Sequence, residues 1–355
     1  MTERENLISL LKRQGYERAP VFFELCPSLE EEFRNRFGKD KDYRDYFGFT
    51  LKEITVNNAI TFPAEAYYPY LTEHGEDVYI DMWGIGHQRG SAAAMHMTKF
   101  VHPLKNAKTV EDILNYPFPS FENYYCKELV QEIAEIKKQD KVSYAHAECS
   151  IWERSWYLRG MEELMMDMLT DEDMAQVLFD IVTDLLIKRV EAFAKADADM
   201  IFFGDDIGMQ HSIMMSRELY QKWIQPRLKK TIHTAKKIKP DILIWYHSCG
   251  YIEPFIPDLI DAGVDILNPV QPECMDFEKI HALYGDRLSF HGTVGTQTTM
   301  PFGTPEEVKR ITKKNLDIAG KKGGLMCSPT HLLEPEVPFE NILAYAEACK
   351  EYSVK

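Results

Sequence analysis

The segment Trp245–Gly250 reads WYHSCG and follows an apolar run, DILI, at residues 241–244. His247 and Cys249 are two positions apart, so in an extended strand both side chains point to the same face. An imidazole and a thiolate held side by side are good ligands for zinc, which accepts nitrogen, sulfur and oxygen donors. A buried cysteine beside a hydrogen-bonded core histidine is the alternative, because this spacing alone is a weak motif.

Two residues near the C-terminus are candidates for a third metal ligand. Cys327 lies within the run GGLMCSPTHLL, and a small core side chain is the simpler interpretation of its place in a predicted strand. His331 follows the same run, where a strand gives way to a loop. A zinc site would therefore combine His247 and Cys249 with one of these two side chains.

Acidic residues also stand where predicted strands stop, and these are the candidate catalytic groups. Asp205 and Asp206 follow two phenylalanines. Because successive strand residues face opposite ways, we expect one of them to point into a site and the other to cap a turn. Glu148 ends the run SYAHAE, two residues after His146, and is either a site acid or a buried ion-pair partner.

Three further polar residues near strand ends are candidates for binding a substrate. Glu24 lies near the end of the run APVFFELC, and Gln271 stands between prolines in NPVQPE. His291 precedes Gly292, and a hydrogen-bonding role suits it better than a ligand role. Aromatic residues make up 12% of the chain, and a subset of them could line a flat pocket for an aromatic substrate.

The elements that must position these residues alternate between strands and helices. Helical periodicity over residues 216–238 is typical of this pattern, and Thr304 with the following Pro-Glu-Glu predicts a helix start. Strand followed by helix, repeated without hairpins, predicts a parallel sheet. The predicted strands cover 19–26, 142–149, 199–208, 241–250, 264–273, 286–295 and 323–333.

Both an open doubly wound sheet and a closed barrel fit this alternation. The polar strand ends favour the (β/α)8 TIM barrel, since its strand ends converge at one mouth. No GxGxxG or GxxxxGK[ST] motif follows the first strand, so a nucleotide-binding fold is not indicated. We expect a single domain over residues 1–355, with an N-terminal helix in 1–18 and an insertion or elaborated loops in 57–120.

Composition limits the partners. The chain has 56 acidic and 41 basic residues and a net charge of −15, which argues against nucleic acid or an anionic membrane as partner. No apolar run approaches the roughly 18 residues of a membrane helix, and the charged N-terminus is unlike a signal peptide. The seven scattered cysteines are typical of reduced thiols, so a cytoplasmic location is expected. The oligomeric state stays open, a homodimer included.

Several segments resemble the uroporphyrinogen decarboxylase-like superfamily and, more closely, its cobamide-dependent methyltransferase branch. They are HSCG, IEPFIPDLIDAGVDILNPVQPE, YGDRLSFHGTVGTQ, PFGTPEEVKR, GGLMCSPTHLLEPEVPFENI and LRGMEELMMD, and the similarity runs from about Arg18 to Tyr352. The resemblance implies a TIM barrel and a zinc ion held by an HxC pair and a distant cysteine. His247 and Cys249 match the pair. Counted back from Asn341, the distant position falls on His331 rather than Cys327.

The resemblance also implies an activity. It is zinc-dependent transfer of a methyl group between a small substrate, such as an aryl methyl ether, and a corrinoid (cobalamin) that is free or carried by a partner corrinoid protein. Glu148, Asp205 or Asp206 would position the substrate or supply a proton. A methylcobamide:thiol methyltransferase and a cofactor-free decarboxylase are the alternatives. The segment RAPVFFELCPSLEEEF is acidic and lacks the arginines with which decarboxylases of this superfamily clamp a polycarboxylate.

Overall fold

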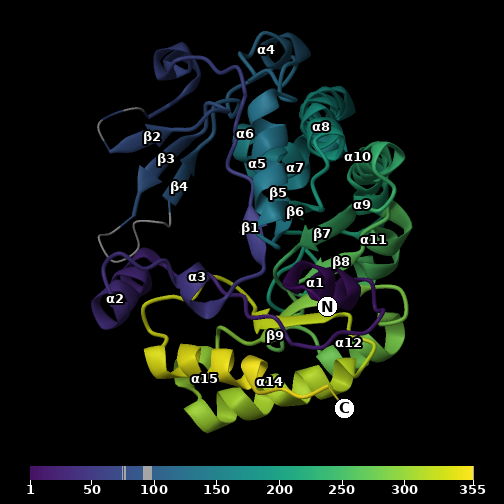
Figure 1. Ribbon diagram of the computed structural model, residues 1–355. Coiled ribbons are helices and arrows are strands. Elements are labelled where there is room, and N and C mark those ends of the chain that lie inside the picture. The colour runs from purple at the N-terminus through teal and green to yellow at the C-terminus, as the bar shows by residue number, and fades with distance from the viewer. Residues whose placement is uncertain (74, 76, 91–97, 355) are drawn as a thin grey trace.

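The computed structural model describes residues 1–73, 75, 77–90 and 98–354, without the side chains of residues 89 and 148. Its main element is a curled sheet of seven parallel strands in the order β1-β5-β6-β7-β8-β9-β10 (Figure 1). The architecture is that of a TIM barrel, as expected. The strands are β1 (Leu51–Glu53), β5 (Val142–Cys149), β6 (Met200–Gly204), β7 (Leu243–His247), β8 (Ile266–Asn268), β9 (Ser289–Val294) and β10 (Leu325–Pro329).

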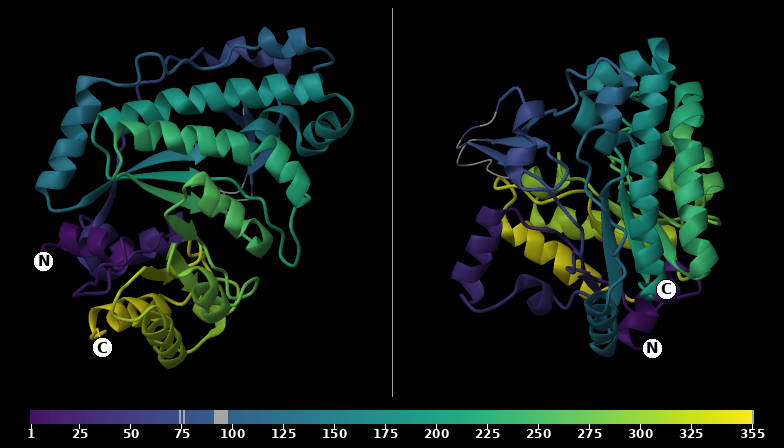
Figure 2. Two further views of the ribbon diagram at one scale, coloured as in Figure 1. Left: turned by 90° about the vertical axis from the view of Figure 1, so that its right-hand side faces the viewer. Right: turned by 90° about the horizontal axis from the view of Figure 1, so that it is seen from above.

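The central strands are apolar runs because both of their faces are covered. All residues of β8, β9 and β10 are buried, as are four of the five in β6 and in β7. Helices pack around the sheet, and the long helices α8 and α10 lie side by side (Figure 2). These helices are α1 (Glu3–Leu11), α5 (Lys127–Lys138), α6 (Trp152–Arg159), α7 (Met161–Thr170), α8 (Glu172–Lys195), α9 (Arg217–Trp223), α10 (Gln225–Ile238), α11 (Ile256–Ala262), α12 (Phe277–Tyr284), α13 (Thr299–Phe302), α14 (Pro305–Ala319) and α15 (Phe339–Lys350).

Helix starts follow local sequence signals. Thr304 caps α14 by accepting a hydrogen bond from the Glu307 amide, with proline in the first turn, as its sequence predicts. The helical stretch at 216–238 is divided at Ile224, because Pro226 cannot donate an amide hydrogen bond and starts a new helix, α10. None of the described helices is both long enough and apolar enough to cross a bilayer.

The first predicted strand is not a strand. Residues 19–26 are extended but make a single parallel bridge, between Leu25 and Leu333. The Phe22 amide and carbonyl instead bond to the hydroxyl of Tyr345, at 3.2 and 3.1 Å, so no strand ladder forms there. Phe22 also packs on Phe49, just before β1, so this segment fills the space between the edge strands β10 and β1. The short strand β1 was not predicted from the sequence.

The region 57–120 adds a small antiparallel sheet of three strands, β2 (Val78–Ile80), β3 (Gly86–Arg89) and β4 (Thr98–Val101), beside the large sheet (Figure 1). Phe100 of β4 stacks on Tyr157 of α6 at 4.2 Å between ring centroids, so this sheet supports a helix that follows β5. The remaining short elements are α2 (Pro27–Phe37), α3 (Tyr43–Phe47), α4 (Val110–Leu114) and the 3-10 turns Ala64–Ala66, Tyr68–Tyr70 and Glu253–Phe255.

Candidate active site

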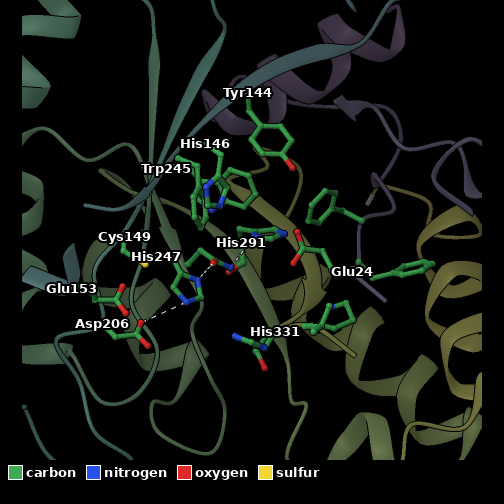
Figure 3. Close-up of a pocket in the computed structure, with 18 of the residues that line it drawn as sticks. Glu24, Tyr144, His146, Cys149, Glu153, Asp206, Trp245, His247, His291 and His331 are labelled. Atoms are coloured by element: carbon green, nitrogen blue, oxygen red, sulfur yellow. Dashed lines mark hydrogen bonds and ion pairs between the residues drawn. The ribbon is translucent and has the colours of Figure 1, made fainter. Parts of the chain in front are cut away.

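A cavity of about 350 Å³ lies at the carboxyl ends of the parallel strands. Residues of six strands, β5 to β10, or of the loops that follow them converge on it, and Figure 3 shows the side chains that point into it. Its wall combines aromatic rings, three carboxylates and several histidines. The lining residues are Phe22, Phe23, Glu24, Tyr144, His146, Cys149, Glu153, Tyr157, Phe202, Gly204, Asp206, Trp245, His247, Asn268, His291, Pro329, Thr330, His331 and Leu332.

His247, Cys249 and His331 come together at one side of this cavity. One potential ligand atom of each residue lies within 4.8 Å of those of the other two. His247 Nε2 and Cys249 Sγ are 3.4 Å apart, although β7 ends at His247 and Cys249 belongs to the following loop. The rings of His247 and His331 are 6.1 Å apart between centroids. The geometry of this cluster is that of three ligands for one metal ion.

Cys327 lies elsewhere. Its buried Sγ is 3.6 Å from Thr293 Oγ1 and 4.0 Å from the carbonyl oxygen of Thr312 in α14, so it faces the helices outside the sheet. Burial raises the pKa of the Cys327 thiol to about 12. His331, four residues later, is past the end of β10 and reaches the cavity.

The turn after β7 requires a glycine. Gly250 has a φ of 85°, and a Cβ atom there would lie 2.7 Å from the Met209 carbonyl oxygen. Gln271 accepts the Gly250 amide hydrogen bond at 2.5 Å. Gln271 is buried and is not part of the cavity wall. The structure therefore places this predicted substrate ligand behind the turn that carries Cys249.

Asn268, which ends β8, orients two histidines. Its Oδ1 is 2.5 Å from His247 Nδ1, and its Nδ2 is 2.7 Å from His291 Nδ1 and 3.2 Å from the His291 carbonyl. The carbonyl contact requires the amide NH2 on the His291 side, so Oδ1 accepts from His247 Nδ1–H. His247 Nε2 is then the atom left to bind a metal. Ser328 Oγ, 2.8 Å away, accepts from His291 Nε2.

The two histidines sit in opposite electrostatic surroundings. Burial would lower the pKa of His247, but the Cys249 sulfur, Asp206 and the hydrogen bond with Asn268 outweigh it and raise that pKa to about 10. Burial and the nearby His247 lower the pKa of His291 to about 3, so His291 is neutral. The surroundings thus favour a positive charge at His247 Nε2 and disfavour one at His291.

The adjacent aspartates face opposite ways. Asp205 is fully buried and accepts hydrogen bonds from the amides of Ile151 and Glu153, at 3.1 and 2.8 Å, so it caps α6 outside the cavity. Burial and the charge of Glu153 raise the pKa of Asp205 to about 7. Asp206 lines the cavity, accepts the Cys249 amide at 2.7 Å and lies 3.6 Å from His247 Nε2 (Figure 3).

Glu153 was not predicted from the sequence. It lies on α6, not at a strand end, and points into the cavity beside Asp206 (Figure 3). The Tyr157 hydroxyl donates to Glu153 Oε1 at 2.8 Å. Burial and the charge of Asp206 raise the pKa of Glu153 to about 7. Asn268 was missed as well, although its place at the end of β8 is the signal that identified His247.

Glu24 and the backbone of Glu148 complete the predicted set. Glu24 lines the cavity on the side of His247 opposite Glu153 and Asp206 (Figure 3). Desolvation by the surrounding protein raises the pKa of the Glu24 carboxyl. The positive charges of His247 and Arg44 act in the opposite direction but do not outweigh it. Glu148 belongs to β5, but its side chain lies outside the described part of the structure.

Aromatic rings form the inner wall. Trp245 of β7 makes edge contacts with Phe202 at 4.7 Å, Tyr144 at 5.6 Å and Phe22 at 6.1 Å between ring centroids. Phe202 stacks on His146 at 4.6 Å. These side chains come from four different segments, so the aromatic wall exists only in the folded chain.

Comparison with known proteins agrees with this architecture. The family profile of uroporphyrinogen decarboxylase (URO-D) matches residues 78–352. The chain belongs to the uroporphyrinogen decarboxylase family. No curated protein is significantly similar to it in sequence.

Among solved structures, a methyltransferase from Methanosarcina mazei shares the fold over 99% of both chains, with a TM-score of 0.65 and 18% identity. A B12-independent methionine synthase from a Shewanella species has a TM-score of 0.42 and 15% identity, over 61% of this chain and 65% of that one. The native xylanase 10B from Thermotoga maritima has a TM-score of 0.40 and 13% identity, over 62% and 78%.

Proposed function

We propose that this protein is a zinc-dependent methyltransferase that moves a methyl group between a small methylated substrate and a corrinoid held by a partner protein. The observation that carries the proposal is the cluster of His247, Cys249 and His331 beside an aromatic cavity at the strand ends. Membership of the uroporphyrinogen decarboxylase family and a shared fold with a Methanosarcina mazei methyltransferase support it.

The three side chains fit zinc by chemistry and by spacing. Tetrahedral zinc with Zn–N near 2.0 Å and Zn–S near 2.3 Å separates nitrogen from sulfur by roughly 3.5 Å, and His247 Nε2 is 3.4 Å from Cys249 Sγ. Asn268 holds the other ring nitrogen of His247, as outer partners of metal-binding histidines commonly do. Zinc bound at these atoms would supply a Lewis acid that stabilises negative charge on the leaving group.

The remaining residues suit an aryl methyl ether as substrate. The faces and edges of Phe22, Phe202 and Trp245 provide an apolar wall against which a substrate ring would pack. Glu153 keeps a proton at its carboxyl up to about neutral pH, so it could deliver that proton to a phenolate oxygen. Asp206 holds the loop of Cys249 in place through the Cys249 amide.

The decarboxylase alternative finds no support in the cavity. Its described lining contains no lysine or arginine, whereas binding a substrate with several carboxylates calls for bidentate cationic donors. A thiol methyltransferase would use the same three metal ligands, and the direction of transfer is a matter for assay.

Metal analysis is the first test. The purified protein should contain about one zinc per chain, and His247→Ala and Cys249→Ser should each lose it. His233→Ala and Cys126→Ser are matched controls away from the cavity and should keep the metal. Full methyl transfer by a protein free of transition metals would refute the proposal.

Methyl transfer is the second test. Incubation with methoxylated aromatics and cob(I)alamin should produce methylcobalamin, followed by its absorbance, and the phenol, followed by chromatography. The same variants should abolish the reaction, and the controls should not. Conversion of a porphyrinogen without metal would establish the decarboxylase instead.

A further inference from the structure

Apart from His247 and the metal that it would hold, the charged side chains around the cavity are carboxylates. Its wall holds the carboxylates of Glu24, Glu153 and Asp206, and no lysine or arginine is among its described lining residues. One cation, Arg154, stands behind the wall and is engaged elsewhere. Arg154 is buried over the ring of Trp83, at 4.7 Å from the centroid, with Asp81 at 3.7 Å.

The carboxylates are placed on two sides of the space. Glu153 and Asp206 lie together on one side of His247, and Glu24 lies on the other, next to the phenylalanine rings (Figure 3). A ring stacked on the aromatic wall with its ether oxygen toward His247 would therefore meet an acidic group whichever way its other substituents point.

A second cavity, of about 580 Å³, continues past Glu24 and shares Phe22, Phe23, Tyr144 and Leu332 with the first. Its cations are already paired. Arg44 lies 3.2 Å from Asp42 Oδ2, Lys141 lies 2.7 Å from Asp45 Oδ1, and Lys52 donates to Gln139. Glu24, Asp42, Asp45 and Glu53 line this space with those three cations, so it offers no net positive charge.

We infer that the site selects its methyl donor by charge. It accepts aryl methyl ethers whose other ring substituent is either uncharged or a protonated amine, and it excludes those that carry a carboxylate. This inference rests on the proposed function. Away from the metal, a benzoate carboxylate would leave water without gaining a lysine or arginine partner, and the carboxylates of Glu24 and Asp206 would repel it. At an effective dielectric constant of about 20, one unit charge about 10 Å from another alters a binding constant roughly ten-fold.

Aromatic rings add to the preference for a cation. An ammonium group held over the faces of indole, phenol and phenyl rings is attracted by their quadrupoles, and the wall offers Trp245, Tyr144 and Phe202. Carboxylates beside aromatic rings suit a protonated amine. Glu24 would be the counter-ion of the ammonium group, on the side of the substrate ring that faces away from Glu153.

The test uses three ligands with one ring and three charges: 4-hydroxy-3-methoxybenzylamine, the corresponding benzyl alcohol and the corresponding benzoate. Their dissociation constants for the purified metal-containing protein are measured by calorimetry at pH 7. We expect the amine to bind several-fold more tightly than the alcohol, and the benzoate at least ten-fold more weakly than the alcohol.

Glu24→Gln tests the residue directly and should lower the ratio of amine affinity to alcohol affinity at least five-fold. Glu32→Gln, on the outer face of α2, removes the same charge away from both cavities and should leave that ratio unchanged. If the native protein bound the benzoate as tightly as the alcohol, the inference would be overturned. If that benzoate binding were then lost in Arg44→Ala, the carboxylate would lie in the second cavity.

Binding and catalysis separate the two proposals. Equal affinity for all three ligands would overturn charge selection and leave methyl transfer standing. The expected order of affinities without methyl transfer to cob(I)alamin would support charge selection and remove the proposed reaction. Failure of all three ligands to bind would overturn both.

Discussion

The two ends of the parallel sheet handle charge in opposite ways. At the amino ends of the strands, Asp199 accepts the amide and hydroxyl of Ser143, both at 3.0 Å, and pairs with Arg4 at 2.5 Å and Lys137 at 3.3 Å. At the carboxyl ends, the cavity carboxylates have no lysine or arginine beside them in the described wall.

Other contacts at the amino end follow the same rule. Asp265 accepts the Ile244 amide at 2.8 Å and pairs with Lys236 at 2.8 Å. Ser289 accepts from Arg13 at 2.7 Å and donates to the Leu11 carbonyl at the end of α1. Asp199, Asp265 and Ser289 each have a partner from a neighbouring element, and each such pair joins two parts of the barrel.

The difference shows where this fold stores stability and where it leaves chemistry free. Complementary pairs at the amino end stabilise the folded chain. At the carboxyl end, desolvation by the surrounding protein raises the pKa values of Glu153 and Glu24, and the charge of Asp206 adds to the effect at Glu153. Raised carboxyl pKa values are unfavourable for folding and useful for moving protons.

The largest effect is expected at the amino end, from Asp199→Ala. Removing this carboxylate leaves the buried Ser143 amide without its acceptor and Arg4 without its partner. We expect the free energy of unfolding to fall by about 3 kcal/mol. Urea denaturation measures it, and methyl transfer per folded molecule should stay unchanged. If Asp199→Ala changed methyl transfer without changing stability, the amino ends of the strands would take part in the reaction, contrary to the contrast between the two ends.

At the carboxyl end, Asn268→Ala should act on metal binding. It frees His247 Nδ1, so the ring loses its fixed orientation. We expect zinc affinity to drop about 10- to 100-fold, measured by competition with a chromogenic chelator. Asn315→Ala is a matched control, because Asn315 is also a buried asparagine but bonds to Thr293 next to α14. Equal loss of zinc in both variants would show a general loosening of the barrel.

Glu153→Gln should change the pH dependence of stability. The folded state binds the Glu153 proton more tightly than an unfolded chain with the ordinary value of 4.5, since its pKa is raised to about 7. This stabilising contribution is complete below pH 4.5 and is lost as the pH rises through 7.

The variant should therefore gain about 2 kcal/mol relative to the native protein between pH 4.5 and pH 8. Thermal unfolding across that range measures the gain, and Glu162→Gln on α7 is the control. An identical pH profile for native protein and variant would mean that folding leaves the pKa of Glu153 unshifted.

The smallest effect is expected away from both ends. Lys230 of α10 and Asp184 of α8 form an exposed ion pair at 3.1 Å on the outer layer of helices. Such pairs are screened by water and salt, so Asp184→Ala should change the free energy of unfolding by less than about 1 kcal/mol. A larger change, measured by urea denaturation, would mean that ion pairs on the outer helices also contribute to the stability of the fold.

Strand ends were the most productive sequence signal for the site. The alternation of apolar runs and helical periodicity predicted six of the strands in the large sheet, and reading polar residues at their ends found His247, Asp206, His291 and His331. The same signal failed for Gln271, which does not line the cavity. The strand ends three residues earlier, at Asn268, and Asn268 is the residue that lines the cavity.

The sequence by itself determined the alternation of strands and helices, the pairing of His247 with Cys249 and the acidic character of the mouth, because these depend on local period and composition. Only the tertiary structure decided that His331 rather than Cys327 joins the pair, that Asp206 rather than Asp205 faces the cavity, and that Glu153 enters from a helix. Which face of a strand end looks inward depends on the twist and register of the whole sheet, and no local pattern carries that information.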